Sequence, residues 1–440
     1  MTTGATEEVP AMSTTIRRAL MMGLCAGAIA VLASTGDSTL ARQQPPQTSL
    51  SVTGAASSAP SLAALDRTIV AVWAASRNGA ANVFAAVSQD AGMTFSEPRR
   101  VNDQDGDASV NSEQPPRVVV SGPVNARAIT VVWSKRNDGP QRSRQDVVRF
   151  SRSTDGGRTF SPARTIHDPT FSGARGWESL APGQSGAVHA VWLDGRDANR
   201  KIAEEAAHSG MPHKGQPPQD VYHGILTPDG RRVETVIASG VCFCCKTAVA
   251  VDVKGTVYAA WRHIFPGSMR DIAFAKSTDG GAHFDPLVRV SEDKWELNGC
   301  PEDGPALAVD RAGAIHVAWA TLVNEGDEPR KAVFYATSRD GRTFSPRTRL
   351  PAAGITPGHP QITLAADGGA VIVWDETVDD VHRVVLAHVS PSRAIGPSRV
   401  LSGAESASHP VIVRTGSDLV VAWASRDESV IRVRRIETAK

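Results

Sequence analysis

Four of the five cysteines in this 440-residue chain are the residues whose type and spacing bear most directly on chemistry. They are Cys242, Cys244, Cys245 and Cys300. The similar phrases AVAVD (248–252) and ALAVD (306–310) start 58 residues apart, and the same offset separates Cys242 from Cys300. These two cysteines therefore occupy equivalent positions in consecutive repeats, directly before a short apolar strand.

Three kinds of chemistry are open to these cysteines. In an exported protein, an even number of cysteines favours disulfides, with Cys300 bonded to Cys242 or Cys244 and the remaining two joined. Thiolates together with imidazoles would instead suit copper or zinc. The candidate ligands are then Cys242, Cys244, Cys245, Cys300, His263, His359 and His409. A third alternative is a redox-active pair, because Lys246 lies beside the Cys-x-Cys-Cys run and would lower a thiol pKa.

A repeated eight-residue phrase indicates which elements position these residues. It occurs at Ser88–Phe95, Ser153–Phe160 and Ser277–Phe284 as S-x-D-x-G-x-[TH]-F, and one residue shorter at Ser338–Phe344. Its Asp would accept hydrogen bonds from the backbone of its own turn, its Gly would supply a residue with φ > 0, and its Phe would pack beneath the turn. We therefore assign a structural role to Asp90, Asp155, Asp279 and Asp340.

Seven short apolar runs that end in Trp form a second repeat. The Trp residues are Trp73, Trp133, Trp192, Trp261, Trp319, Trp374 and Trp423. Each run is rich in β-branched residues and follows a turn, which is typical of a buried strand. Most runs have a further strand before them and another after them, followed by the phrase and a short fourth strand. This pattern predicts an all-β fold, a β-propeller of four-stranded antiparallel blades. We favour seven blades, with six as the alternative.

The predicted blades bring ionisable residues to one face. The position before the first strand carries Glu113, Glu178, Asp303, His359 and His409 in different repeats. Loops that enter the first strand lie at the same end of a blade as loops that join its second and third strands, and the repeated turns lie at the other end. The cysteines and these residues should therefore surround the mouth of the central channel.

The N-terminal residues 1–41 have the pattern of an export signal. Arg17 and Arg18 precede the apolar stretch Ala19–Ala33, which contains Cys25, and small residues follow it up to Ala41. The stretch is too short to span a membrane with these flanks. We expect a secreted or periplasmic protein without a membrane span.

The remaining chain divides into two segments. Residues 42–59 form an N-terminal segment, in which Thr48–Thr53 could supply the missing outer strand of the last blade. Residues 60–440 form the propeller. The chain has a net charge of +1, with both signs interspersed, which argues against a nucleic-acid partner. We expect a monomer with a small ligand at the channel mouth.

The repeated phrase resembles the Asp-box, or bacterial neuraminidase repeat, of the sialidase superfamily of β-propellers. The resemblance covers nearly the whole mature chain as scaffold. It implies a ligand site at the channel mouth, where carbohydrate would be bound or hydrolysed in the manner of an exo-sialidase, with no cofactor required. The alternative function is that of a metal-binding or protein-interaction propeller, which would use the cysteines and histidines on the same face.

The resemblance also implies particular site residues. In that family, three arginines bind the sugar carboxylate, a Tyr–Glu pair supplies the nucleophile and an Asp acts as acid and base. The arginines on the expected face are Arg77, Arg136, Arg196 and Arg426. Tyr222 follows a loop about twenty residues longer than its counterparts and is the candidate nucleophile, with Glu204 and Asp197 as candidate partners. The family's Arg-Ile-Pro motif is absent, and the sequence around Arg117 is a poor substitute for it.

Overall fold

The computed structural model describes residues 47–109, 111–136, 146–170, 173–209, 219–230, 232–297, 303–325 and 328–438. The chain divides into two compact units, Met1–Gln44 and Pro45–Lys440, and every described residue belongs to the second. The expected export signal and Cys300 lie outside the described residues. In the part of the chain that is described, no helix is long and apolar enough to cross a membrane.

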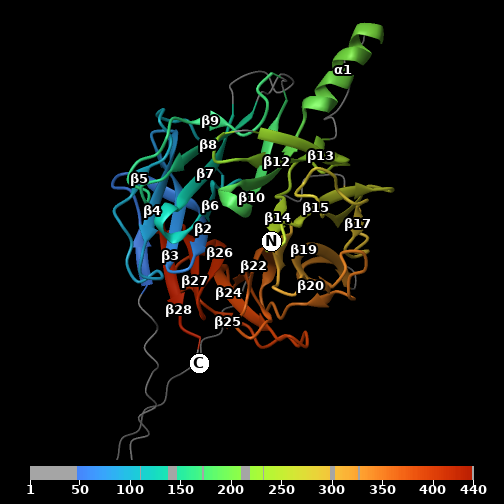
Figure 1. Cartoon of the computed structure of the whole chain (residues 1–440). Helices are drawn as coiled ribbons and strands as arrows, with labels where there is room; N and C mark the ends of the chain where they lie inside the picture. Colours follow the sequence, from blue (N-terminus) through green and yellow to red (C-terminus); the bar gives the residue numbers. More distant parts are fainter. Residues whose placement is uncertain are drawn as a thin grey trace, which may run out of the picture. The chain divides into compact units, whose positions relative to one another are not determined.

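Four-stranded antiparallel sheets build this unit (Figure 1). Among the described residues, five sheets have four strands, and a sixth has eight strands in two groups that meet at the pair Val241 and His263. In each four-stranded group, the strand that carries the Trp is the second strand across the sheet. It pairs with the strand that precedes it in the sequence. This repeated order is a β-propeller of four-stranded blades, which confirms the fold class predicted from the sequence.

We name each blade by its Trp and give its strands from the inner to the outer one. The Trp73 blade has β2 (Ala56–Leu65), β3 (Thr68–Arg77), β4 (Ala80–Ser88) and β5 (Arg99–Arg100). The Trp133 blade has β6 (Arg117–Ser121), β7 (Ala128–Lys135), β8 (Val147–Ser153) and β9 (Arg164–Thr165). The Trp192 blade has β10 (Arg175–Pro182), β11 (Val188–Asp194), β12 (Gln219–Leu226) and β13 (Arg232–Val241).

The other blades continue this order. The Trp261 blade has β14 (Ala248–Val251), β15 (Val257–Phe265), β16 (Met269–Ser277) and β17 (Val288–Arg289). The Trp319 blade has β18 (Ala306–Val309), β19 (Ile315–Glu325), β20 (Glu328–Ser338) and β21 (Thr348–Arg349). The Trp374 blade has β22 (Ile355–Leu364), β23 (Ala370–Val378), β24 (Val381–Val389) and β25 (Arg399–Val400). The Trp423 blade has β26 (Ala407–Thr415), β27 (Asp418–Ser425), β28 (Val430–Ile436) and β1 (Gln47–Leu50).

Strand β1 joins the two ends of the described chain. It pairs antiparallel with β28, from Gln47 opposite Arg434 to Leu50 opposite Ile431. The first and last strands of the chain therefore lie side by side (Figure 1). The pairing covers an edge of β28 that would otherwise be open to another chain. A helix, α1 (Arg196–Ser209), follows β11 and extends away from the sheets (Figure 1), and short 3₁₀ turns occur at Val124–Ala126 and Gln184–Gly186.

The core consists of separate interfaces between neighbouring blades. All seven Trp side chains are fully buried. Trp319, for example, packs in one cluster with Tyr258 and Phe274 of the preceding blade, and Trp73 packs with Ala422 of the Trp423 blade. Each blade thus buries its apolar face only against its neighbours, so that a chain of this length needs no single large core.

The repeated turns have the hydrogen bonds that their residue types allow. The Ser88 hydroxyl donates to Asp90 Oδ1 at 2.7 Å, and the Thr94 backbone N–H and hydroxyl donate to the two Asp90 oxygens at 2.9 and 2.6 Å. These bonds hold the pKa of Asp90 down at about 2, although partial burial opposes the shift. Such a carboxylate is fully occupied by its own turn.

Two adjacent glycines in one of these turns provide a matched test of packing. Gly281 has φ +98°, and a Cβ there would lie 2.0 Å from His223 Cε1, whereas a Cβ on Gly280 (φ +74°) would meet nothing within 4 Å. We expect Gly280→Ala to cost about 1–2 kcal/mol of unfolding free energy from backbone strain. Gly281→Ala should cost about 1–3 kcal/mol more from overpacking. Urea denaturation of both variants measures the difference, and equal losses would show that His223 yields freely.

Candidate functional site

Four inner strands begin with a bulge that places a residue other than glycine in the left-handed region. These residues are Ala59, Trp177, His359 and His409, with φ values of 55°, 61°, 51° and 54°. The register of the inner strand against its neighbour shifts at each of these positions. Such conformations cost on the order of 1–3 kcal/mol each and tend to occur where function requires them. The inner ends of the blades are therefore the first place to look for a site.

The two strained histidines meet a carboxylate from another part of the propeller. Glu113 Oε1 lies 2.8 Å from His359 Nε2 and 3.0 Å from His409 Nε2, and its other oxygen lies 2.7 Å from Lys246 Nζ. These residues come from the Trp133, Trp374, Trp423 and Trp261 blades. Since most of these blades are not neighbours, the contacts must cross the central channel.

Two further carboxylates hold the histidines in place. Asp375 accepts a hydrogen bond from His359 Nδ1 at 2.9 Å and from the His409 backbone N–H at 2.6 Å. Asp303 accepts the His359 backbone N–H at 3.0 Å and pairs with Lys331 at 3.1 Å. We call Glu113, Lys246, Asp303, His359, Asp375 and His409 the axial cluster. The backbone of His359 and His409 is strained, with φ near +50°. Asp303 and Asp375 hold it in place because they accept the backbone N–H groups of these two residues.

The geometry gives the two imidazoles different protonation states. Both ring nitrogens of His359 contact carboxylates, which only accept hydrogen bonds, so that His359 carries two N–H groups and a positive charge. Burial alone would lower the pKa of His359, but Asp375 outweighs it and raises the pKa to about 9. Burial lowers the pKa of His409, which is therefore neutral at pH 7. Its Nε2 must donate to Glu113, which leaves a lone pair on Nδ1.

The axial cluster borders a small hollow. Its lining includes Lys246, His359 and His409 together with Arg117 of β6. The side chains of Glu113 and His359 are 18% and 20% exposed, and those of Asp303 and Asp375 are nearly buried. Burial would raise the pKa of Glu113, but Lys246 and the two histidines hold it well below its usual range. The hollow thus combines a protonated imidazole, a neutral imidazole and an ammonium group.

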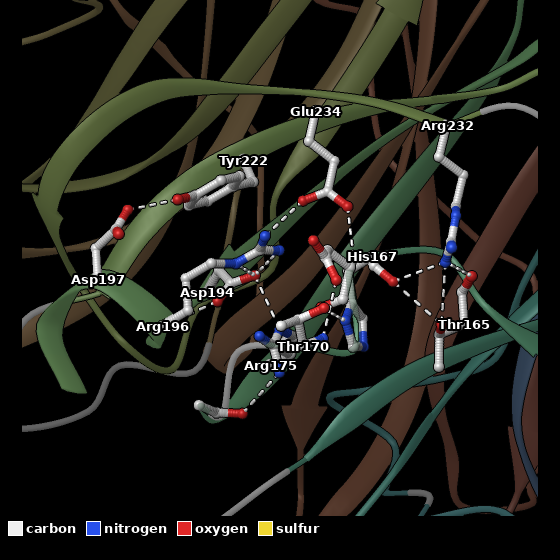
Figure 2. Close-up of polar contacts among 12 residues, drawn as sticks. Thr165, His167, Thr170, Arg175, Asp194, Arg196, Asp197, Tyr222, Arg232 and Glu234 are labelled. Carbon is white, nitrogen blue, oxygen red and sulfur yellow. Dashed lines mark hydrogen bonds and ion pairs between the residues drawn. The ribbon is translucent and has the colours of Figure 1, made fainter. Parts of the chain in front are cut away.

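A second polar network lies in the Trp192 blade, among residues of β10, β11, α1 and β13 (Figure 2). Asp194 is fully buried and accepts hydrogen bonds from Arg175 Nε at 2.9 Å, Arg196 Nη2 at 2.6 Å and Trp192 Nε1 at 2.9 Å. Arg196 also pairs with Glu234 at 2.6 Å. The charges of Arg175 and Arg196 balance those of Asp194 and Glu234, and Asp194 also accepts the N–H of the buried Trp192 indole. We therefore infer that this network stabilises the fold.

Two of the residues predicted to be catalytic do meet in this region. The Tyr222 hydroxyl donates a hydrogen bond to Asp197, and the Arg196 guanidinium lies 4.4 Å from the centre of the Tyr222 ring (Figure 2). Burial, followed by the bond to Asp197, raises the pKa of Tyr222 well above its usual value. A phenol with a raised pKa is a weak nucleophile. Glu204 lies further along α1, where it is exposed.

The arginines predicted to bind a carboxylate have different surroundings. Arg77 donates to the Gly54 carbonyl at 2.8 Å, Arg426 donates to the Ser408 hydroxyl at 3.1 Å, and Arg196 belongs to the Asp194 network. Arg136 is exposed. Among the described residues, no recorded contact joins any two of the four, and their role in binding stays a prediction.

The cysteines form a separate buried cluster beside the axial cluster. Cys242 Sγ lies 3.6 Å from Cys245 Sγ and 3.8 Å from Cys244 Sγ. Cys242 and Cys245 are free thiols, because 3.6 Å greatly exceeds an S–S bond of about 2.05 Å. This corrects the alternative in which the four cysteines form two disulfides. Cys244 is disulfide-bonded. The hydrogen bond from Cys245 outweighs burial and lowers the pKa of Cys242 to about 6.

The histidines predicted as ligands do not share a site with these sulfurs. His263 packs edge-on against Phe265 and accepts a hydrogen bond from Trp261 Nε1 at 3.4 Å. His359 and His409 belong to the axial cluster. Two sets of donor atoms, each within 4.8 Å, could hold a metal among the described residues: Cys242 with Cys244 and Cys245, and Glu113 with His359 and His409. In the second set, the Lys246 ammonium beside Glu113 opposes a cation.

Sequence reasoning placed Glu113, Asp303, His359 and His409 at one end of their blades but did not pair them. The contact between Glu113 and His409 joins residues 296 positions apart. The role of Asp375 was also missed, although it lies directly after the Trp374 strand run, where a side chain can turn toward the neighbouring inner strand. The signal that could have identified Asp375 is a carboxylate directly after a Trp run, in the same repeat as a histidine at the start of the inner strand.

Comparisons with known proteins agree on the fold. No family model and no curated protein sequence matches the chain. An ulvan lyase of polysaccharide lyase family PL25 is 9% identical, with a TM-score of 0.56, over 88% of this chain and 95% of its own. The α-L-arabinofuranosidase Arb93A from Fusarium graminearum is 11% identical, with a TM-score of 0.50, over 90% of this chain and 97% of its own. These two matches show that the scaffold is a β-propeller.

A leech intramolecular trans-sialidase also matches, at 11% identity and a TM-score of 0.44, over 87% of this chain and 68% of its own. This likeness is too distant to bear on the site. At identities near 10%, the matches concern the fold alone, because one propeller scaffold can carry unrelated sites. What the chain does must therefore be argued from its own residues.

Proposed function

We propose that this protein binds and processes carbohydrate at the axial cluster. The observation that carries the proposal is the pair of imidazoles on Glu113, one protonated and one neutral, at the border of a hollow. Two enzymes of the same fold are named for action on carbohydrate, an ulvan lyase and an arabinofuranosidase, which supports this class of ligand. The proposal assigns the axial cluster to the mouth of the channel, where the sequence predicts a ligand site.

The residues have complementary roles in such chemistry. Glu113 holds the Nε2–H of His409, so that the lone pair on His409 Nδ1 serves as a general base once a ligand opens access to it. This atom is buried and has no hydrogen-bond partner among the described residues. His359, whose two N–H groups are held by Glu113 and Asp375, fixes the position of Glu113 and adds a positive charge to the site. Lys246 and Arg117 give the hollow a positive lining that suits an anion. Its free volume is about 10 Å³, so that a sugar carboxylate enters only when neighbouring side chains move.

The test compares variants of the two candidate sites on one panel of charged and neutral polysaccharides. We expect His409→Gln to reduce turnover by about 10²–10⁴-fold, as for loss of a general base. Arg77→Gln, Arg426→Gln and Tyr222→Phe should keep turnover within about threefold, because none of them touches the axial cluster. A loss in Tyr222→Phe with normal turnover in His409→Gln would instead place sialidase-type chemistry at the Tyr222–Asp197 pair.

Export to the periplasm or beyond is part of the proposal, and it rests on residues 1–41 of the sequence. N-terminal sequencing of the protein recovered outside the cytoplasm should begin near residue 42. Recovery of the full-length chain from the cytoplasm would contradict export without affecting the site.

A further inference from the structure

The distances between the buried sulfurs match those expected around a metal ion. Cys242 Sγ lies 3.6 Å from Cys245 Sγ and 3.8 Å from Cys244 Sγ. Metal–sulfur bonds of about 2.3 Å at a tetrahedral angle place two sulfurs about 3.8 Å apart. A disulfide would place them at about 2.05 Å. The observed distances are those of contacts between thiols that are not bonded to each other, and they also equal the spacing that two ligands of one ion require.

The surroundings of the sulfurs exclude hard ligands. Cys242, Cys244 and Cys245 are at most 4% exposed and pack with Trp177, Phe243 and Ile264. Among the described residues, no carboxylate or imidazole joins the three in one set of donor atoms. A site made of sulfur alone selects soft, thiophilic ions. Calcium and magnesium, which require oxygen ligands, are excluded.

Two buried arginines lie on the strands next to the cysteines, Arg262 on β15 and Arg270 on β16, and the Cys242 backbone N–H donates to the Arg262 carbonyl at 3.4 Å. Arg262 is 1% exposed, and its guanidinium donates to the carbonyls of Asp303, Arg270 and Ala320. Arg270 donates to the Leu297 carbonyl, and its Nη1 has no hydrogen-bond partner within the described part of the chain. No ion pair with a carboxylate is recorded for either guanidinium among the described residues. Buried cations of this kind require negative charge nearby.

We propose that Cys242 and Cys245 bind one thiophilic metal ion of the d¹⁰ class, Cu(I) or Zn(II), between their sulfurs. Two thiolates with Cu(I) keep one negative charge beside the two guanidiniums, whereas two thiolates with Zn(II) are neutral. Charge therefore favours Cu(I). Two thiolates alone would hold Cu(I) in a line with their sulfurs about 4.6 Å apart. The observed spacing therefore requires Cys244 as a third ligand, which it becomes when its disulfide is reduced. This site is independent of the carbohydrate proposal, since it shares no residue with the axial cluster.

The experiment loads the full chain anaerobically with Cu(I) or with Zn(II), before and after reduction of the disulfide. We expect one ion per chain, held against a competing chelator, with Cu(I) retained at least tenfold more tightly than Zn(II). Cys242→Ser and Cys245→Ser should each weaken retention at least a hundredfold. His359→Gln and His409→Gln, which alter the other candidate set, should leave it unchanged. Tighter retention of Zn(II) would overturn the charge argument.

A measurement on the unchanged protein covers the case in which a cysteine variant does not fold. X-ray absorption of the loaded chain should show sulfur neighbours near 2.3 Å and no nitrogen bonded to the metal. A nitrogen-only shell, or metal lost with His409→Gln and kept with Cys242→Ser, would move the site to the axial cluster. Absence of binding, or recovery of a Cys242–Cys245 disulfide from protein kept anaerobic, would refute the proposal.

Discussion

Replacing Asp194 with alanine is expected to lower the free energy of unfolding by about 3–5 kcal/mol, because it leaves two buried guanidiniums without their shared anion. Arg175 and Arg196 are 1% and 8% exposed, and Asp194 is fully buried. Burial would raise the pKa of Asp194, but the two arginines hold it below its usual range, so that the carboxylate is charged in the folded protein. The indole N–H of Trp192 would lose its acceptor as well.

The neighbouring Asp197 is the matched control. Its side chain is 20% exposed, and it accepts one hydrogen bond from Tyr222 and pairs with Arg200 at 2.9 Å. Asp197→Ala should therefore cost only about 0.5–1.5 kcal/mol. Urea denaturation at pH 7 measures both variants. A loss below 1 kcal/mol in Asp194→Ala would mean that water or Glu234 replaces the missing anion, and the network would then be a weaker anchor than its burial indicates.

The scaffold could be predicted from local sequence because each of its signals repeats. A single Trp at the end of a β-branched run predicts one buried strand, whereas seven such runs predict a regular array of strands. All seven indoles are buried, as this pattern predicts. The Ser, Asp, Gly and Thr of the turn around Asp90 specify their own hydrogen bonds within five residues. Neither signal depends on contacts that are distant in sequence.

The candidate site could be predicted only in part because its contacts are distant. Glu113, His359 and His409 meet across the channel, and nothing local to Glu113 indicates a histidine 296 residues later. The repeat predicted that these residues lie at one end of their blades, but it did not predict which of them touch. Cys242 and His409 were predicted as ligands of one site, and the structure places them in different clusters.

Resemblance to a family was a better guide to scaffold than to site. The arginines after the Trp strands lie at equivalent positions of the repeat, and such positions are as well suited to a structural role as to ligand binding. Arg196 shows the structural role, since its charge is balanced by Asp194 and Glu234. Tyr222 stacks on Trp192 with ring centres 6.0 Å apart, as Phe84 and Phe334 do on their own blade Trp residues. The ring of Tyr222 therefore has the same packing role as Phe84 and Phe334 in their blades. Only its hydroxyl distinguishes it from those two residues.

A large pH effect above neutral pH is expected at His359. In wild type its pKa is about 9, above the ordinary value of about 6.5 for an unfolded chain. The folded state therefore binds this proton more tightly, and the resulting stability is fully present below pH 6.5 and is lost as the pH rises through 9. A difference of about 2.5 pKa units corresponds to roughly 3 kcal/mol. Asp375→Asn removes the carboxylate that causes the shift, so burial should bring the pKa of His359 below 6.5.

NMR titration of the imidazole signals and urea denaturation from pH 6 to pH 9.5 test this expectation together. Wild type should lose stability across this range relative to Asp375→Asn, and the two curves should approach each other at high pH. Asp367→Asn is the matched control, because it breaks an exposed pair with His388 at 3.0 Å that is worth at most about 1 kcal/mol. If His359 still titrates near 9 in Asp375→Asn, then Glu113 alone holds the proton. In that case the imidazole of His359 would stay charged at the hollow without Asp375. The only role of Asp375 would then be to fix the strained backbone of His409.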